Sequence, residues 1–182
     1  MTPKTKRALL RKLRSLIPLL FFPLVAILLV SGLVIVQGSQ TGASHADAIL
    51  VILPSEGERP FVEYGLNLYR QNQANLLLIF GENPEKAQQY LQEQGLSGDA
   101  YLVVKSATKQ LLMGEVVAQA YQHEIRTVLV VDAPVRMLLD LKQAGDQGLE
   151  AYGAPLTSEQ PNIGAVLQAA LNYWGYLLVG ER

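Results

Sequence analysis

Polar side chains follow four short apolar segments of the chain, and their types could support binding or catalysis. Each segment is short and rich in Val, Ile and Leu, which is typical of strands covered on both faces in a parallel sheet. Because parallel strands end at one edge of a sheet, where open α/β folds bind ligands, we expect these side chains to gather there. The candidate ligand-binding residues are Ser55, Glu56, Gly81, Glu82, Lys105, Ser106, Thr108, Asp132 and Arg136.

This set does not contain the machinery of a common catalytic site. No two of its side chains have a spacing that specifies acid–base catalysis, and the chain has no Walker, GxGxxG or GxSxG motif. It has no cysteine, which excludes thiolate catalysis and cysteine-based zinc sites. His45 and His123 have no second ligand at metal spacing. We therefore predict no catalytic residue, no metal and no cofactor.

Arg136 has two interpretations, which the sequence leaves open. It could bind an anion at the sheet edge, or it could pair with Asp132 or Asp140 one helical turn away. Farther along the same helix, we expect Asp140, Lys142 and Asp146 to form a solvated face.

Apolar runs and helical patterns alternate from residue 47 onward. The predicted strands are 48–53, 76–80, 101–104, 127–131 and a weaker one at 149–152. The predicted helices are about 59–71, 85–94, 108–123, 135–144 and 161–178. Short links between them predict an α/β fold with a doubly wound, mostly parallel sheet of about five strands, a Rossmann-like three-layer sandwich. We expect the last helix to pack on the sheet rather than to enter the membrane as a second span.

The N-terminal part of the chain predicts one transmembrane helix before this domain. Residues 16–36 carry no charge and would extend roughly 30 Å as a helix, the thickness of a bilayer core. The alternatives to a membrane anchor are a buried core helix and a cleaved signal peptide. We divide the chain into a basic cytoplasmic tail (1–15), a transmembrane signal-anchor (16–37), a linker (38–46) and an exported domain (47–182).

The charge distribution supports this topology and limits the partners. Six of the fifteen basic residues precede residue 15, which favours a cytoplasmic N-terminus and a periplasmic, extracellular or lumenal domain. The rest of the chain has nine basic against sixteen acidic residues, a balance of −7. A domain this acidic does not suit nucleic acid or an anionic lipid surface. The predicted partners are the lipid bilayer, through residues 16–37, and a membrane protein.

Several short motifs recur in an order that suggests a family. They are an Asp-Ala-Ile strand opening, a Leu-Tyr pair, a glycine turn, a Glu-x-Ala helix start, a glycine helix end and an aromatic-rich last helix. The matching residues are Asp47, Ala48, Ile49, Leu50, Leu68, Tyr69, Gly81, Glu85, Ala87, Gly95, Leu96, Tyr173 and Gly175. Over about residues 46–178 the chain resembles the ElyC/SanA/YdcF-type bacterial envelope proteins. The resemblance implies a role in envelope construction, and one branch of the family is linked to binding S-adenosylmethionine.

The chain departs from that family at the expected site. Residues 53–55 read Leu-Pro-Ser where relatives carry a run of glycines, and a Thr-x-Glu-Asn pattern keeps only Thr108. The segment after the fourth strand keeps Arg136 but no histidine, and Asn172 replaces a glutamate. These changes remove the proton carriers and the glycine cradle for a phosphate. The resemblance therefore implies a divergent member with a degenerate site.

The sequence as a whole favours a membrane-anchored, non-catalytic interaction or assembly subunit. The alternative is an envelope-biogenesis protein or enzyme that binds a small anionic ligand, phosphate-bearing or nucleoside-type, at the strand ends. Whether the chain is an enzyme stays open, although we favour a non-catalytic role.

Overall fold

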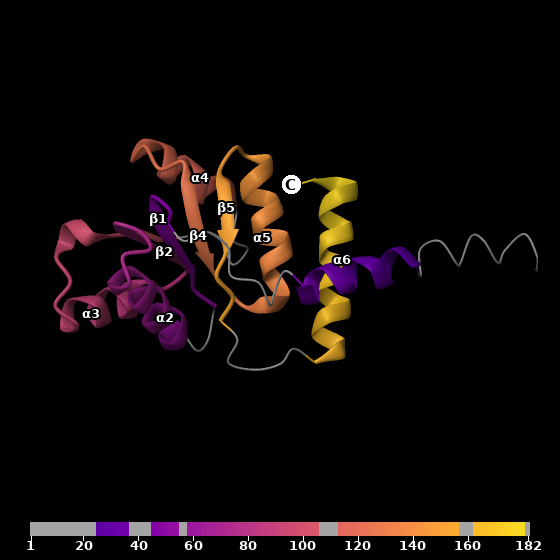
Figure 1. Cartoon of the computed structure of the whole chain (residues 1–182), viewed down its shortest axis with the longest axis horizontal. Coiled ribbons are helices and arrows are strands. Elements are labelled where there is room, and N and C mark those ends of the chain that lie inside the picture. The colour runs from indigo at the N-terminus through magenta and orange to yellow at the C-terminus, as the bar shows by residue number, and fades with distance from the viewer. Residues whose placement is uncertain (1–24, 37–44, 55–57, 106–112, 157–161, 181–182) are drawn as a thin grey trace, which may run out of the picture.

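A computed structural model describes residues 25–36, 45–54, 58–105, 113–156 and 162–180 (Figure 1). Its strands are β1 (Ala48–Ile52), β2 (Leu76–Gly81), β3 (Tyr101–Lys105), β4 (Thr127–Val131) and β5 (Glu150–Gly153). Its helices are α2 (Glu58–Arg70), α3 (Glu85–Glu93), the short turn η1 (Gly98–Ala100), α4 (Met113–Gln122), α5 (Pro134–Asp146) and α6 (Ile163–Val179). Residues 25–36 form a further helix, called here the N-terminal helix.

The five strands form one parallel sheet in the order β3-β2-β1-β4-β5. Strand β1 lies at its centre, where Leu50 pairs with Leu78 of β2 on one side and with Val130 of β4 on the other. The chain winds outward from β1 in one direction as far as β3 and then in the other as far as β5. This topology confirms the predicted doubly wound, Rossmann-like α/β fold.

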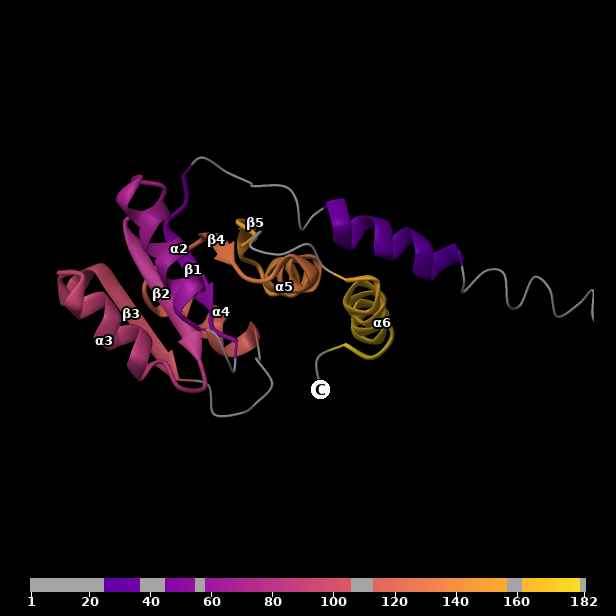
Figure 2. The ribbon, with the colours of Figure 1, turned by 90° about the horizontal axis from the view of Figure 1, so that it is seen from below.

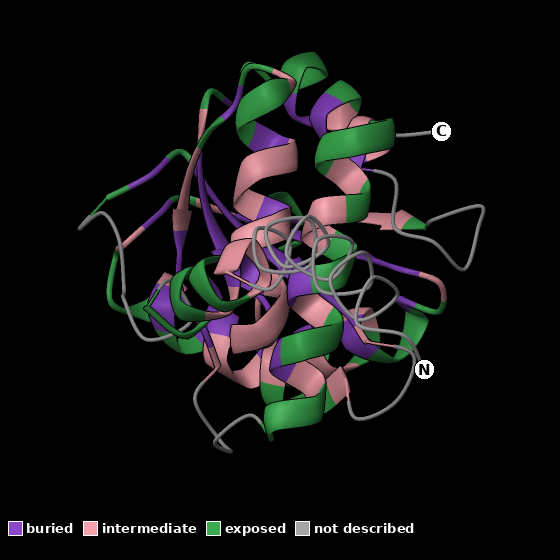
Figure 3. Ribbon diagram, turned by 90° about the vertical axis from the view of Figure 1, so that its right-hand side faces the viewer, coloured by how far each residue is buried: buried purple, intermediate pink, exposed green. Residues whose placement is uncertain are grey.

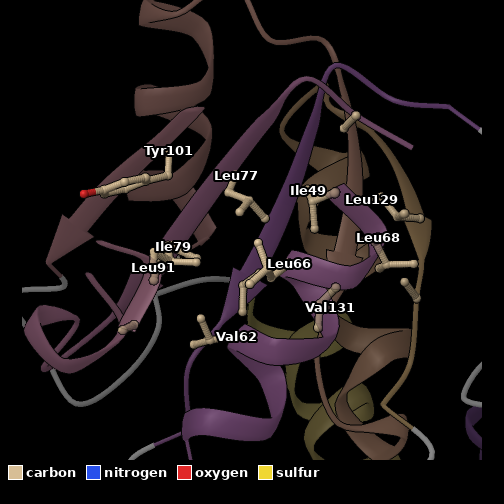
Figure 4. Packing of buried hydrophobic residues seen from close by; sticks show 14 of the residues in the cluster. Ile49, Val62, Leu66, Leu68, Leu77, Ile79, Leu91, Tyr101, Leu129 and Val131 are labelled. Atoms are coloured by element: carbon tan, nitrogen blue, oxygen red, sulfur yellow. The ribbon is translucent and has the colours of Figure 1, made fainter. Parts of the chain in front are cut away.

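Helices cover both faces of the sheet, because alternate side chains of each strand point to opposite faces. Ile49 and Val51 of β1 pack with Leu66 of α2 and Leu91 of α3 on one face (Figure 4). The opposite face is formed by intervening residues such as Leu50, under α4 and α5. The result is the predicted three-layer sandwich.

Helix α6 lies outside these layers. Its buried residues Val166 and Ala170 pack against Val30 and Val34 of the N-terminal helix, with Leu138 of α5 at the same cluster. Figure 2 shows α6 beyond α5, away from the sheet. The prediction that this helix packs on the sheet is therefore wrong, because α4 and α5 already cover that face.

The N-terminal helix falls within the predicted transmembrane segment 16–37, and the rest of that segment lies outside the described residues. Within the described parts of the chain, no helix combines the length and the apolar character needed to cross a membrane. The membrane span stays a prediction.

Gly65 sets the distance between α2 and the central strand. A Cβ atom at this position would collide with Cγ2 of Val51, a β-branched side chain that cannot move far within the sheet. We expect Gly65→Ala to lower the free energy of unfolding by about 1–3 kcal/mol, the usual effect of overpacking. Denaturant unfolding of the full chain in detergent, followed by circular dichroism, measures it.

The matched control is Gly145→Ala in α5. Nothing lies within 4 Å of a Cβ atom there. Removing a helical glycine should then raise the free energy of unfolding by up to about 1 kcal/mol. Equal effects of the two substitutions would contradict the close approach of α2 to β1.

Candidate functional site

The carboxyl ends of the strands bring together part of the predicted site. Gly81 and Lys105 are register partners at the ends of β2 and β3, and Glu82 directly follows Gly81. Asp132 and Arg136 lie on the other side of β1, after β4 and in the first turn of α5. The other candidates, Ser55, Glu56, Ser106 and Thr108, lie outside the described residues.

The space above Gly81 is filled by Leu53. A Cβ atom on Gly81 would lie 2.8 Å from Cβ of Leu53, whose side chain is buried. The backbone N–H of Leu53 also donates to the carbonyl of Phe80 at 2.8 Å, which extends the pairing of β1 with β2. A glycine cradle needs open space beside its backbone. Gly81 instead accommodates an apolar side chain from the neighbouring strand.

Lys105 is engaged by helix α3. Its Nζ atom donates to Oε1 of Glu85 at 2.8 Å, and both side chains are exposed. The hydrogen bond from Lys105 lowers the pKa of Glu85 below its ordinary value. An exposed pair of this kind contributes at most about 1 kcal/mol. Lys105 therefore has a partner within the chain but is not rigidly fixed.

Asp132, Arg136 and Asp140 form an Asp–Arg–Asp cluster along one side of α5. Nε of Arg136 lies 3.4 Å from Oδ2 of Asp132, and its Nη2 lies 3.8 Å from Oδ1 of Asp140. The two aspartate side chains are 2% exposed, whereas that of Arg136 is 42% exposed. Oδ1 of Asp132 also accepts from the backbone N–H of Ala133 at 2.6 Å, at the start of α5. One cation thus lies between two buried carboxyl groups.

Burial dominates the electrostatics of this cluster. It raises the pKa of Asp140 well above its ordinary value, and the charge and hydrogen bond of Asp132 raise it further, while Arg136 opposes them. Burial alone would lower the pKa of Arg136, but the carboxylates of Asp132 and Asp140 raise it above its ordinary value. Burial and Arg136 therefore act in opposite directions on the pKa of Asp140.

The structure shows the ion pairs that one interpretation of Arg136 predicted, since Arg136 lies near Asp132 and Asp140 together. The prediction that Asp140 belongs to a solvated face is wrong, because Asp140 is buried between Met137 and Ala144 along α5. The signal was present in the sequence, since apolar residues three before and four after Asp140 mark the buried side of the helix. Lys142 and Asp146 do form a surface ion pair.

Most of the described residues of this edge have contacts within the chain. Lys105, Asp132 and Arg136 each have an ion-pair partner or a hydrogen bond from this chain, and Gly81 is packed by Leu53. These contacts stabilise the fold.

The comparisons with known proteins identify no family. No family profile matches the chain, and no curated protein sequence matches it. One similar solved structure is that of a protein from Corynebacterium glutamicum, determined in a structural genomics programme. It is 14% identical with a TM-score of 0.43, and the match covers 82% of this chain and 70% of that protein. The resemblance to the ElyC/SanA/YdcF-type proteins therefore stays a prediction.

The raised pKa of Asp140 predicts an unusual pH dependence of stability. A carboxyl group whose pKa is raised in the folded state stabilises the fold when protonated, and this contribution is lost as the pH rises through the folded pKa. Asp140→Asn keeps the neutral form at every pH. We expect the variant to gain stability over the wild type as the pH rises from about 4 to about 8, measured by denaturant unfolding at each pH.

Asp146→Asn is the matched control on the same helix. The hydrogen bonds from Lys142 and Tyr176 lower the pKa of Asp146, so its contribution is present above the ordinary pKa and is lost as the pH falls. This variant should lose stability relative to the wild type as the pH rises. Two variants with the same sign would contradict the assignment.

Removing the cation should destabilise the Asp–Arg–Asp cluster. Arg136→Met keeps an apolar stem but removes the cation beside the buried carboxyl groups of Asp132 and Asp140, so we expect a loss of about 1–3 kcal/mol near neutral pH. Lys105→Met, which breaks an exposed pair, should lose less than about 1 kcal/mol. Adding Asp140→Asn to Arg136→Met should recover part of the loss in a double-mutant cycle. An effect of Arg136→Met as small as that of Lys105→Met would show that the cluster does not stabilise the fold.

Proposed function

We propose that this protein is a membrane-anchored, non-catalytic interaction or assembly subunit. The observation that supports it is the use of the strand-end residues within the fold. Arg136 compensates Asp132 and Asp140, and Gly81 receives Leu53. Residues engaged in this way maintain the scaffold, and scaffolds of this class acquire new tasks on their surfaces.

In this proposal residues 16–37 anchor the chain in a membrane, and the domain from residue 47 onward is exported. The absence of charge over residues 16–36 and the basic residues before them support the anchor. Contact between the N-terminal helix and α6 also supports it, since this contact ties the domain to the end of the anchor. The domain would then be held at the membrane surface, where it meets other membrane proteins.

The resemblance to the ElyC/SanA/YdcF-type envelope proteins supports a role in the bacterial envelope. A second candidate function is the binding of a small anionic ligand at the strand ends. It is favoured by one observation, the partial exposure of the Arg136 side chain. An anion there would have to compete with two aspartates of the chain itself, which is why we rank this function second.

Affinity purification of the full-length protein from native membranes in mild detergent tests the first function. We expect one partner at near-equal amount, identified by mass spectrometry and lost when residues 46–182 are deleted. The partner should be retained by Lys105→Met, which alters only an exposed ion pair at the strand ends. A protein that is recovered alone would contradict the assembly role.

The same preparation tests the second function. Inorganic phosphate and nucleotides should leave the melting temperature of the wild-type protein unchanged. A saturable increase that is lost in Arg136→Met but kept in Lys105→Met would replace the first proposal by the second.

A further inference from the structure

Helix α6 presents an apolar stripe that the described residues leave uncovered. Ile163, Leu167, Leu171 and Leu178 are exposed and follow one another at helical spacing on one side of the helix. No residue of α6 is charged. Exposed apolar stripes of this length mark interaction sites in folded proteins. Leu167, Leu171 and Leu178 lie roughly a quarter turn around the helix from Val166 and Ala170, which pack on the rest of the molecule.

Two polar residues that interrupt this stripe are hydrogen-bonded to each other. Gln168 and Asn172 lie among the exposed leucines, and Nε2 of Gln168 donates to Oδ1 of Asn172 at 3.0 Å. Burying an amide in an apolar environment is unfavourable chiefly when its hydrogen bonds are lost. The mutual bond therefore lowers the free-energy cost of placing this side of α6 in contact with apolar groups.

The apolar surface continues from α6 onto the N-terminal helix. Leu28, Leu29 and Leu33 are exposed there, while Val30 and Val34 pack against α6. The two helices lie crosswise, as both perpendicular views show (Figures 1 and 2). Figure 3 shows the molecule from the right-hand side of Figure 1, with exposed residues in green on several of its helices. A helix crosswise to a membrane span is oriented along the plane of the bilayer.

The position of this contact along the proposed anchor indicates how deep α6 would lie in the membrane. Val34 and Val30 precede Val36, the last residue of the apolar run that begins at Leu16, by two and six residues. At the helical rise this corresponds to about 3 and 9 Å from the end of the span. Helices that lie in the interface are buried about 5–10 Å into the boundary between headgroups and acyl chains. The contact therefore places α6 at the depth expected for an interfacial helix.

We propose that α6 is an interfacial membrane helix whose exposed apolar stripe contacts the lipid bilayer and seats the domain on the membrane. The inference rests on the proposed anchor, because the anchor defines the direction of the bilayer. The lipid it fits is uncharged or zwitterionic, since α6 supplies no cation to an anionic headgroup. Its second face is already taken by α5 and the N-terminal helix, so the lipid contact needs no rearrangement of the fold.

Spin labelling of the full chain tests this contact, because the absence of native cysteine allows single labels. Leu167→Cys and Leu171→Cys report on α6, Leu28→Cys on the anchor, and Gln89→Cys on an exposed residue of α3. Each protein is reconstituted in zwitterionic vesicles, and the accessibility of the label to oxygen and to a water-soluble nickel complex is compared. We expect the oxygen-to-nickel ratio to be several-fold higher at positions 28, 167 and 171 than at position 89.

The possible outcomes distinguish a failure of the inference about α6 from a failure of the proposed anchor. A high ratio at position 28 with a low ratio at 167 and 171 would overturn the inference and leave the anchor intact. A low ratio at position 28 would overturn the anchor itself. Labels at 167 and 171 that are immobilised and shielded from both reagents would show a protein partner or a second copy on this face instead of lipid, which also overturns the inference. Circular dichroism of each variant checks that the fold is retained.

Discussion

The complete burial of strand β1 is the constraint on which the rest of the structure depends. All five of its residues have 0% exposure, and it is hydrogen-bonded to a parallel strand on both sides. A strand in this position needs helices over both faces of the sheet, because no part of it can face water. The alternation of strand and helix follows from that need, and so does the close approach of α2 at Gly65. It also brings the carboxyl ends of the strands together beside buried side chains.

Charged groups at that edge must therefore be compensated inside the protein. Asp132 directly follows the buried strand β4, and Asp140 lies on the buried side of α5. A charged carboxylate at either position would be unfavourable without a compensating group. Arg136 lies between the two aspartates, and burial raises the pKa of Asp140, which favours its neutral form. The polar residues of this cluster thus stabilise one another within the fold.

The sequence predicted the elements well, because each strand is an apolar run and each helix has an apolar side. The 127–131 strand agrees in full, and most other predicted bounds differ by one or two residues. The packing of Leu53 on Gly81 was not predictable, because it joins segments that are distant in sequence. The burial of Asp140 was missed because its charge was given more weight than the apolar residues around it. The place of α6 was missed because a helix without charges does not specify its partner.

The core of the sheet and the cluster between α6 and the N-terminal helix differ in how completely polar residues cover them. In the sheet, each apolar face meets a helix whose outer side is polar, so the core ends within the protein. The cluster between α6 and the N-terminal helix buries Val30, Val34, Val166 and Ala170 but leaves neighbouring leucines exposed. Exposed apolar area in water is unfavourable by about 25 cal/mol per Å², so an open cluster of this kind is poorly matched to water on all sides. Helix α5 joins this cluster to the core of the sheet, because one side of it packs on the sheet and another on α6. Helix α5 therefore lies between α6 and the sheet, and it also carries Arg136 and Asp140 of the Asp–Arg–Asp cluster. A lipid or protein surface that contacts α6 is thus separated from this cluster by one helix.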